Sequence, residues 1–331
     1  MKKLLFIIVL SFNLLLPGIN QAKVIFLNFT HIVAEDTPKG LAANYLKKLV
    51  EEKSQGRLRI NVFPNMSQKG FDDTRAVMAL QKGAVQLVCP SISKFTKSIP
   101  QLQLFDLPFL FESPKHFHAF THSPKGQHLL TLLTQKGLTG LAYWDNGFKM
   151  LFNNKRPIKK PEDIKGLKFR VMPSEVLKAQ FEVLGAQAIA MPYSKVYDAL
   201  KDGTVDGFEN TWSNFYSKQF YKVQKYITIS EHGYLGYILT TSNKVLNTLP
   251  PDLKKIFLEA VKEATEYEIN IAAKTNQQFL EKLKQVSGLH FTVLTPEDKK
   301  IWQKAMQPVY DQFSPIIGKE YIQAVQSIKE K

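Results

Sequence analysis

Three side chains in the middle of the chain suit the binding of a small anion: Arg170, Tyr193 and Asn210. A guanidinium presents a planar fork of donors that fits a carboxylate through two parallel hydrogen bonds, and an amide beside it offers donors and an acceptor. A guanidinium in apolar surroundings requires an anionic partner, because burying an unpaired charge is costly. These residue types therefore indicate a carboxylate site, if the fold brings them together.

The elements that must position these side chains are three successive βα units. Residues 167–171, 188–191 and 205–208 have the short apolar or alternating patterns of strands, and the first two are followed by helices that Ser174 and Ser194 are placed to cap. Each of the three side chains lies at or just after the end of one strand. Ligands of open parallel sheets bind outside the carboxyl ends of the strands, so the three side chains should converge.

The amino-terminal part of the chain has the same plan. Strands are predicted at 24–29, 58–63 and 85–89, and the intervening helices begin at Pro38 and at Asp73. A second lobe of this kind runs from roughly residue 141 to residue 208, and a cleft lies between the two lobes.

An internal similarity links the lobes, because residues 79–85 resemble residues 199–205. The similarity is either structural or the common sequence of a helix that ends at glycine before a valine-rich strand. In the structural interpretation, Ser91 faces Asn210 across the cleft.

From Pro251 to about Ser287 the chain predicts one long helix, since no glycine and no further proline interrupts its helically spaced apolar residues. At 1.5 Å per residue it would be on the order of 50 Å long, longer than one lobe is wide. The alternative is a helix broken or kinked along its length.

Residues 1–22 have the pattern of a cleaved secretory signal peptide, with Lys2 and Lys3 before an uncharged apolar run and a small residue at Ala22. The run is too short to span a bilayer. We therefore expect a periplasmic protein. The single cysteine, Cys89, lies in an apolar run and is expected to be buried rather than reactive.

The chain has 44 basic and 29 acidic residues, for a net charge of +15. Nucleic acid is not an expected partner, because export separates the protein from it and no basic patch is interleaved with aromatic residues. The positive field favours an anionic ligand or an acidic partner surface.

Several fragments resemble one family of transport proteins, in one order between about Phe29 and Gln307: DTPKG, LPFLF, WDNGF, RPIKKPEDIKG, GLKFR, MPYSKVYDAL, KDGTVDGFENT, FYKVQKYI and NTLPP. The family is that of the extracytoplasmic solute-binding proteins of tripartite ATP-independent periplasmic (TRAP) transporters. The resemblance implies an α/β, two-lobed periplasmic-binding-protein fold (Venus flytrap) with a long helix bracing both lobes. It divides the chain into a first lobe of 23–147 plus about 236–275 and a second lobe of 148–235 plus about 276–331.

The resemblance also implies roles for particular residues. Arg170 would clamp the ligand's carboxylate, Asn210 would contact the ligand beside it, and Tyr193 would place its ring against the ligand. Lys149 lies where many members carry a second arginine; it keeps the charge and loses the fork.

Each of these roles has a structural alternative. Arg170 could pair with Glu209 inside the protein, Asn210 could cap the next helix, and Tyr193 could be a hydrophobic staple.

Three further residues are candidates by position. His31 and Glu35 belong to the first strand-to-helix loop, at the mouth of the cleft, and Trp212 could form part of the pocket wall. Each of these residue types more often packs than binds. Four histidines lie close together in the sequence: His116, His118, His122 and His128. No cysteine or set of acidic residues near them would complete a metal site, so we expect these histidines at the surface and no bound metal.

The sequence thus predicts a binding protein for a small organic acid, a C4-dicarboxylate or a related carboxylate, that works as a monomer with membrane permease subunits. No cofactor is expected, because no phosphate-binding loop is present. A ligand-sensing subunit of a membrane receptor would use the same fold. A periplasmic hydrolase is less favoured, since neither G-x-S-x-G nor H-E-x-x-H occurs.

Overall fold

The computed structural model describes residues 23–329. The expected signal peptide, residues 1–22, lies outside the described residues. Within residues 23–329, no helix is both long enough and apolar enough to cross a membrane.

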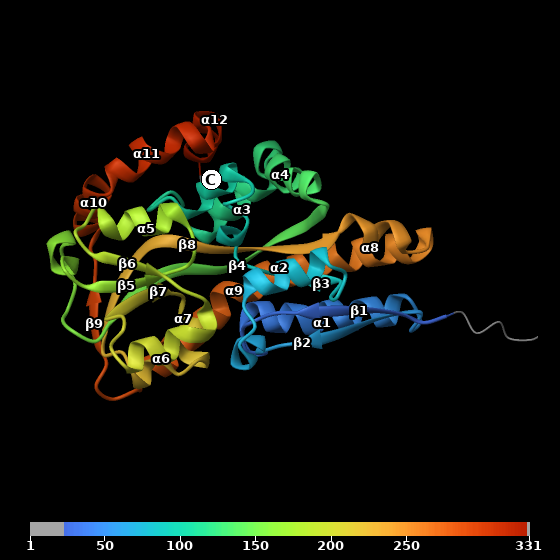
Figure 1. Cartoon of the computed structure of the whole chain (residues 1–331), viewed down its shortest axis with the longest axis horizontal. Helices are drawn as coiled ribbons and strands as arrows, with labels where there is room; N and C mark the ends of the chain where they lie inside the picture. Colours follow the sequence, from blue (N-terminus) through green and yellow to red (C-terminus); the bar gives the residue numbers. More distant parts are fainter. Residues whose placement is uncertain (1–22, 330–331) are drawn as a thin grey trace, which may run out of the picture.

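The described residues form one nine-stranded sheet with a parallel set of strands at each end. β1 pairs in parallel with β2 and β3, and β5 pairs in parallel with β6 and β7. Two long antiparallel strands, β4 and β8, run between the two sets (Figure 1). The strands are β1 (Ile25–Thr30), β2 (Leu58–Phe63), β3 (Leu87–Val88), β4 (Leu138–Asn153), β5 (Lys168–Val171), β6 (Gln187–Ala190), β7 (Gly207–Asn210), β8 (Tyr226–Ser242) and β9 (His290–Val293).

Helices cover both faces of this sheet (Figure 1). They are α1 (Pro38–Lys53), α2 (Asp73–Gln81), α3 (Pro114–His122), α4 (Pro124–Thr131), α5 (Glu175–Glu182), α6 (Val196–Lys201), α7 (Trp212–Ser217), α8 (Asn243–Thr248), α9 (Pro251–Lys284), α10 (Pro296–Ala305), α11 (Gln307–Ile317) and α12 (Lys319–Gln326). We call β1–β3 with α1 and α2 the first lobe, and β5–β7 with α5–α7 the second lobe.

The sequence patterns explain most element boundaries. α1 begins at Pro38 as expected, and Thr37 caps it: the Thr37 side chain accepts a hydrogen bond from the backbone of Gly40. Ser174 caps α5 in the same way. Ser194 does not cap a helix, because it lies inside a 3₁₀ turn, η6 (Tyr193–Lys195), that runs directly into α6.

The long helix predicted after Pro251 is present and unbroken as α9, which has 34 residues. Near its start, Phe257 is packed in a cluster with side chains of α1 and the first-lobe strands. Near its end, Phe279 and Leu283 are packed in a different cluster with side chains of the second lobe. The helix therefore braces both lobes.

The last two helices contact the region before β4 as well as the second lobe, to which the expected division assigned residues 276–331. α11 lies against the 3₁₀ segment η3 (Pro100–Asp106), and α12 lies against α3. Phe313 and Ile322 are buried in one cluster with Phe117 and other side chains of that region. Val176 and Ala179 of α5 belong to the same cluster, so the apolar faces of α11 and α12 are completed by side chains from before β4 and from the second lobe.

A pair of substitutions tests whether α9 braces the lobes through its buried face. Phe257 is fully buried and its neighbour Leu258 is 40% exposed. We expect Phe257→Ala to lower the free energy of unfolding by about 3–5 kcal/mol, since it leaves a cavity in the core. Chemical denaturation followed by circular dichroism measures this loss.

Leu258→Ala is the matched control and should change stability by no more than about 0.5 kcal/mol. Equal effects of the two substitutions would contradict the assignment of the buried face.

Candidate functional site

A pocket lies between the two lobes, at the carboxyl ends of parallel strands from both of them. It encloses about 500 Å³ of empty space, with solvent at its mouth included. The lining includes five residues that the sequence predicted for the site: Ser91, Lys149, Arg170, Tyr193 and Asn210. The carboxyl-end rule for parallel sheets therefore applies to both lobes at once.

Arg170 is the next-to-last residue of β5, and its side chain is buried with 2% exposed. Its Nε and Nη2 atoms donate to the carbonyl oxygen of Met191 at 3.2 and 3.0 Å. No carboxylate of the described residues lies within ion-pair distance, and Nη1 makes no hydrogen bond to them. Burial lowers the pKa of Arg170 to about 10, an effect that the charge of Glu209 partly offsets, so the group stays protonated at neutral pH.

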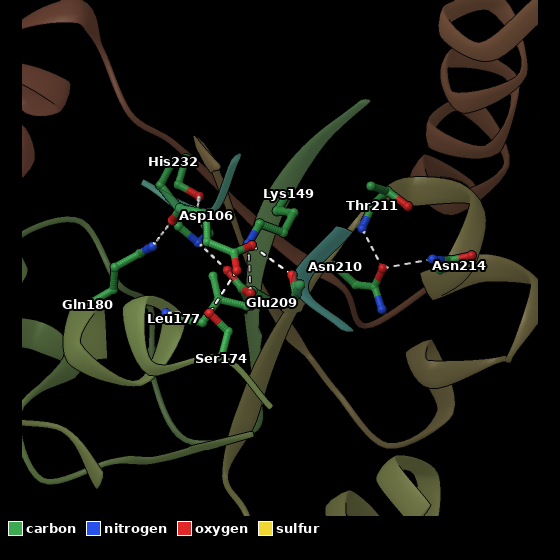
Figure 2. A network of polar contacts seen from close by, with 12 residues as sticks. Asp106, Lys149, Ser174, Leu177, Gln180, Glu209, Asn210, Thr211, Asn214 and His232 are labelled. Carbon is green, nitrogen blue, oxygen red and sulfur yellow. Dashed lines mark hydrogen bonds and ion pairs between the residues drawn. The ribbon is translucent and has the colours of Figure 1, made fainter. Parts of the chain in front are cut away.

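Glu209, the internal acid considered as a partner for Arg170, is bound elsewhere. Its carboxylate accepts from Nζ of Lys149 at 2.8 Å and contacts Nε2 of His232 at 2.9 Å (Figure 2). Burial alone would raise the pKa of Glu209, but Lys149 and His232 outweigh it and lower that pKa to about 2. Glu209 is therefore ionised and already paired.

His232 completes this group as a neutral imidazole. Burial lowers its pKa, although the contact with Glu209 opposes that shift. Because the ionised carboxylate of Glu209 can only accept, Nε2 of the neutral ring carries the proton and donates to it. Nδ1 of His232 then accepts from the hydroxyl of Ser230 at 2.7 Å. The site thus holds one ion pair with a neutral donor beside it.

Lys149 lines the pocket, but its charge is neutralised inside the protein. Its side chain is 2% exposed and makes the ion pair with Glu209. Gly233 leaves room for it, because a Cβ atom at that position would lie 2.6 Å from Cε of Lys149. The sequence suggested that Lys149 provides a second cation for the ligand, and its pairing with Glu209 does not support that role.

Asn210 and Ser91 each present a polar group without a protein partner. Oδ1 of Asn210 accepts from the backbone of Thr211 and from Nδ2 of Asn214, each at 2.9 Å (Figure 2). Its Nδ2 group has no acceptor among the described residues. The hydroxyl of Ser91 is buried and also has no hydrogen-bond partner in the part of the chain that the structure describes. Two polar groups from opposite lobes therefore remain for a ligand.

Tyr193 lies beside Arg170, with the guanidinium carbon 6.0 Å from the centre of its ring. The ring packs edge-on against Phe220, and the hydroxyl lies 3.5 Å from the carbonyl oxygen of Asn214. The ring is thus held as a partly buried wall of the pocket, where it limits the access of water to Arg170.

Three expected site residues are not part of the pocket lining. His31 is buried against Phe29, and neither ring nitrogen has a hydrogen-bond partner among residues 23–329. Burial and the charge of Lys39 lower the pKa of His31 to about 3, so its ring is neutral. Glu35 is exposed at the surface. Trp212 packs edge-on against Phe152 in the core of the second lobe.

Two lysines of the lining had no role in the sequence interpretation. Lys39 lies in the first turn of α1 and is 1% exposed, and Lys94 ends the short 3₁₀ segment η2 (Ile92–Lys94). The signal for Lys39 was its place two residues after the Thr37 cap, in the first turn of α1. Lys94 had no local signal, because a lysine in a loop is ordinarily exposed.

A buried acid connects the region before β4 to the second lobe. Asp106 accepts hydrogen bonds from the hydroxyls of Ser93 and Ser174, each at 2.7 Å (Figure 2). Burial raises the pKa of Asp106, and the nearby charge of Lys149 partly opposes this. Since Ser174 also caps α5, this contact fixes the start of the helix that follows Arg170.

The four histidines of residues 116–128 are not all at the surface, which corrects the sequence expectation. His116 is buried, and its Nε2 atom lies 2.9 Å from the carbonyl oxygen of Val325 in α12. His118 pairs with Asp145. His122 and His128 are exposed.

The buried ion pair can be tested by removing one partner or both. Glu209→Gln leaves the ammonium of Lys149 buried without a counter-charge, so we expect a loss of about 3–5 kcal/mol in the free energy of unfolding. Chemical denaturation at neutral pH measures it. The double variant Lys149→Met with Glu209→Gln should lose less than Glu209→Gln alone, and a larger loss would contradict the pairing.

The pairing also predicts a loss of stability in acid. The pKa of Glu209 is depressed in the folded state, from 4.5 to about 2, so its stabilising contribution is complete above about pH 4.5 and declines as the pH falls toward 2. We expect the difference in unfolding free energy between the wild type and Glu209→Gln to shrink over this range. Denaturation series at several pH values measure the difference, and a constant difference would argue against an ionised Glu209.

Comparison with known proteins identifies the family. The family model for "Bacterial extracellular solute-binding protein, family 7" matches residues 29–315. The C4-dicarboxylate-binding periplasmic protein DctP of Shewanella loihica is 43% identical over 304 residues, which cover 92% of this chain and 90% of that protein.

Two solved structures of similar proteins differ in their ligands. A TRAP periplasmic solute-binding protein of Sulfurospirillum deleyianum with bound succinate is 43% identical, with a TM-score of 0.89 and coverage of 93% of this chain and 100% of that one. The sugar-acid-binding protein DctPAm of Advenella mimigardefordensis with galactonate is 31% identical, with a TM-score of 0.88 and coverage of 92% and 97%. With its matching fold and interlobe pocket, this chain belongs to family 7 of the bacterial extracellular solute-binding proteins, the solute-binding proteins of TRAP transporters.

Proposed function

We propose that this protein captures a small organic acid, a C4-dicarboxylate or a related carboxylate, and delivers it unchanged to the membrane permease subunits of a TRAP transporter. One observation carries the proposal: the buried guanidinium of Arg170 has no anionic partner among the described residues. A buried charge of this kind requires a counter-charge, and a carboxylate matches the geometry of its free donors.

The groups around Arg170 support a carboxylate rather than a neutral ligand. The second carboxylate oxygen or a neighbouring hydroxyl of the ligand can accept from Nδ2 of Asn210, which has no protein acceptor within residues 23–329. The unpartnered hydroxyl of Ser91 approaches from the first lobe. The bound ligands of the similar proteins, succinate and galactonate, share a carboxylate and differ in the rest of the molecule.

Binding would be coupled to closure of the lobes, because the ligand contacts both of them. The register of β4 against β8 is interrupted between Asp145 and Phe148, in the segment that crosses from one lobe to the other. An irregular register provides a place where the strands can bend. A ligand that bridges the lobes stabilises the closed form by its greater affinity for that form, and the permease would bind the closed form.

Export to the periplasm is part of the proposal. The amino-terminal pattern of a signal peptide and the membership of a family of extracellular binding proteins support it. The protein would act there as a monomer and without a cofactor.

A ligand screen tests the carboxylate assignment. We expect succinate, malate or a related acid to raise the melting temperature of the refolded, ligand-free protein, and neutral sugars to have no effect. A ligand at a hundredfold excess over its dissociation constant adds about 2.7 kcal/mol of stability. Arg170→Ala should weaken the binding by at least about 100-fold, because each charge-assisted bond contributes about 1.5–3 kcal/mol.

Arg59→Ala is the control, since Arg59 is an exposed arginine outside the pocket. It should leave the melting shift unchanged. Binding of acids that survives Arg170→Ala would remove the clamp assignment, and chemical conversion of the ligand, followed by NMR, would favour a hydrolase instead.

A further inference from the structure

Asn146 lies in the irregular segment of β4, where the strand crosses from one lobe to the other. The register of β4 against β8 is interrupted between Asp145 and Phe148, so Asn146 and Gly147 lie outside the regular pairing. Gly147 has a φ of 83°, a conformation that residues with a side chain seldom adopt. A bulge of this kind changes the direction of the side chains next to it. The Asn146 side chain is consequently 1% exposed, and it is not part of the pocket lining.

The side-chain amide of Asn146 uses all of its hydrogen-bonding positions inside the protein. Its Nδ2 group donates to Oγ1 of Thr211 at 2.8 Å and to the hydroxyl of Tyr237 at 3.3 Å. Its Oδ1 atom accepts from Oγ of Ser213 at 2.7 Å and from Nδ2 of Asn276 at 3.1 Å. A carboxamide has two donor hydrogens and two acceptor positions, so the orientation of this amide is fixed.

Asn276 supports this arrangement from the long helix α9. Its Nδ2 group also donates to the backbone oxygen of Asn146 at 3.0 Å, and its Oδ1 atom accepts from the backbone of Ser213 at 3.0 Å. Ser213 belongs to the first turn of α7, the helix that follows β7 and Asn210. Asn146 is therefore held between the helix that braces both lobes and the start of a second-lobe helix.

The network ends at the amide of Asn210, which lines the pocket. The backbone of Thr211 and Nδ2 of Asn214 both donate to its Oδ1 atom, each at 2.9 Å (Figure 2). Nδ2 of Asn214 also donates to the hydroxyl of Tyr237 at 3.5 Å. Thr211 and Tyr237 are the two residues to which Asn146 donates, so it supports both contacts that orient Asn210. A rotated Asn210 amide would oppose donor to donor, so its Nδ2 group is the one left free.

We propose that Asn146 is a positioning residue for ligand binding: without touching the ligand, it fixes the amide of Asn210 so that the Nδ2 group donates to the bound acid. This inference rests on the proposed function, in which Asn210 contacts the ligand beside Arg170. Even Asn276, the most exposed side chain of the network, is only 8% exposed. Since water has little access, the loss of one member leaves other buried polar groups unpaired, and they reorient.

A double-mutant cycle tests this role, with succinate as the ligand and isothermal titration calorimetry as the measurement. We expect Asn210→Ala to weaken succinate binding at least about tenfold, because a hydrogen bond to a charged group is lost. Asn146→Ala should weaken it about two- to tenfold. The double variant should bind no more weakly than Asn210→Ala alone, because Asn146 acts through Asn210. A residue that only stabilises the fold would weaken binding by the same factor in both backgrounds.

Two substitutions of Thr211 give an independent measurement, which also serves if Asn146→Ala folds poorly. Thr211→Val removes the acceptor of the Asn146 amide and leaves that amide in place. Thr211→Ser keeps the hydroxyl. We expect Thr211→Val to weaken succinate binding about two- to tenfold and Thr211→Ser to bind succinate as the wild type does.

Asn153→Ala is the matched control, since Asn153 is also a fully buried asparagine of β4 and lies outside the pocket lining. Its Oδ1 atom accepts from the backbone of Lys155 and of Arg156, just after the strand ends. We expect Asn153→Ala to lower the melting temperature and to leave the dissociation constant of succinate unchanged.

The outcomes separate this inference from the proposed function. The positioning role is wrong if Asn146→Ala or Asn210→Ala binds succinate as tightly as the wild type, or if their two factors multiply in the double variant. It is also wrong if Thr211→Val and Thr211→Ser bind succinate equally. In each of these cases the carboxylate clamp of Arg170 stands. If no carboxylate binds the wild type, the proposed function fails and the positioning role fails with it.

Discussion

The site depends on how the protein distributes its buried charges. Glu209 could have neutralised Arg170, but it is bound by Lys149 at 2.8 Å and by His232 at 2.9 Å. Each charge of this ion pair therefore has a partner in the absence of a ligand, whereas Arg170 has none among the described residues. Because an unpaired buried charge is unfavourable, an anion from outside is stabilised where the protein supplies no anion of its own.

The architecture places this unpaired cation between two lobes instead of inside one. The parallel strands of each lobe end at the same cleft, so loops from both lobes contribute side chains to one pocket. β4, β8 and α9 are continuous through the crossing region and keep the two sets of loops opposed (Figure 1). The hydrogen bonds that Asp106 accepts from Ser93 and Ser174 join the region before β4 to the second lobe. A ligand at the pocket consequently contacts elements that are far apart in the sequence.

The sequence by itself determined most of the elements and several residues of the pocket lining. Local patterns predicted the βα units and a long helix at α9, since each depends on residues close together in the chain. The rule for the carboxyl ends of parallel strands then predicted the convergence of Arg170, Tyr193 and Asn210. Only the tertiary structure decided that Glu209 pairs with Lys149, that α11 packs against η3 and α12 against α3, and that Lys39 is buried in the pocket while Glu35 is exposed. Pairing and burial depend on which distant segments meet, and no local pattern records that.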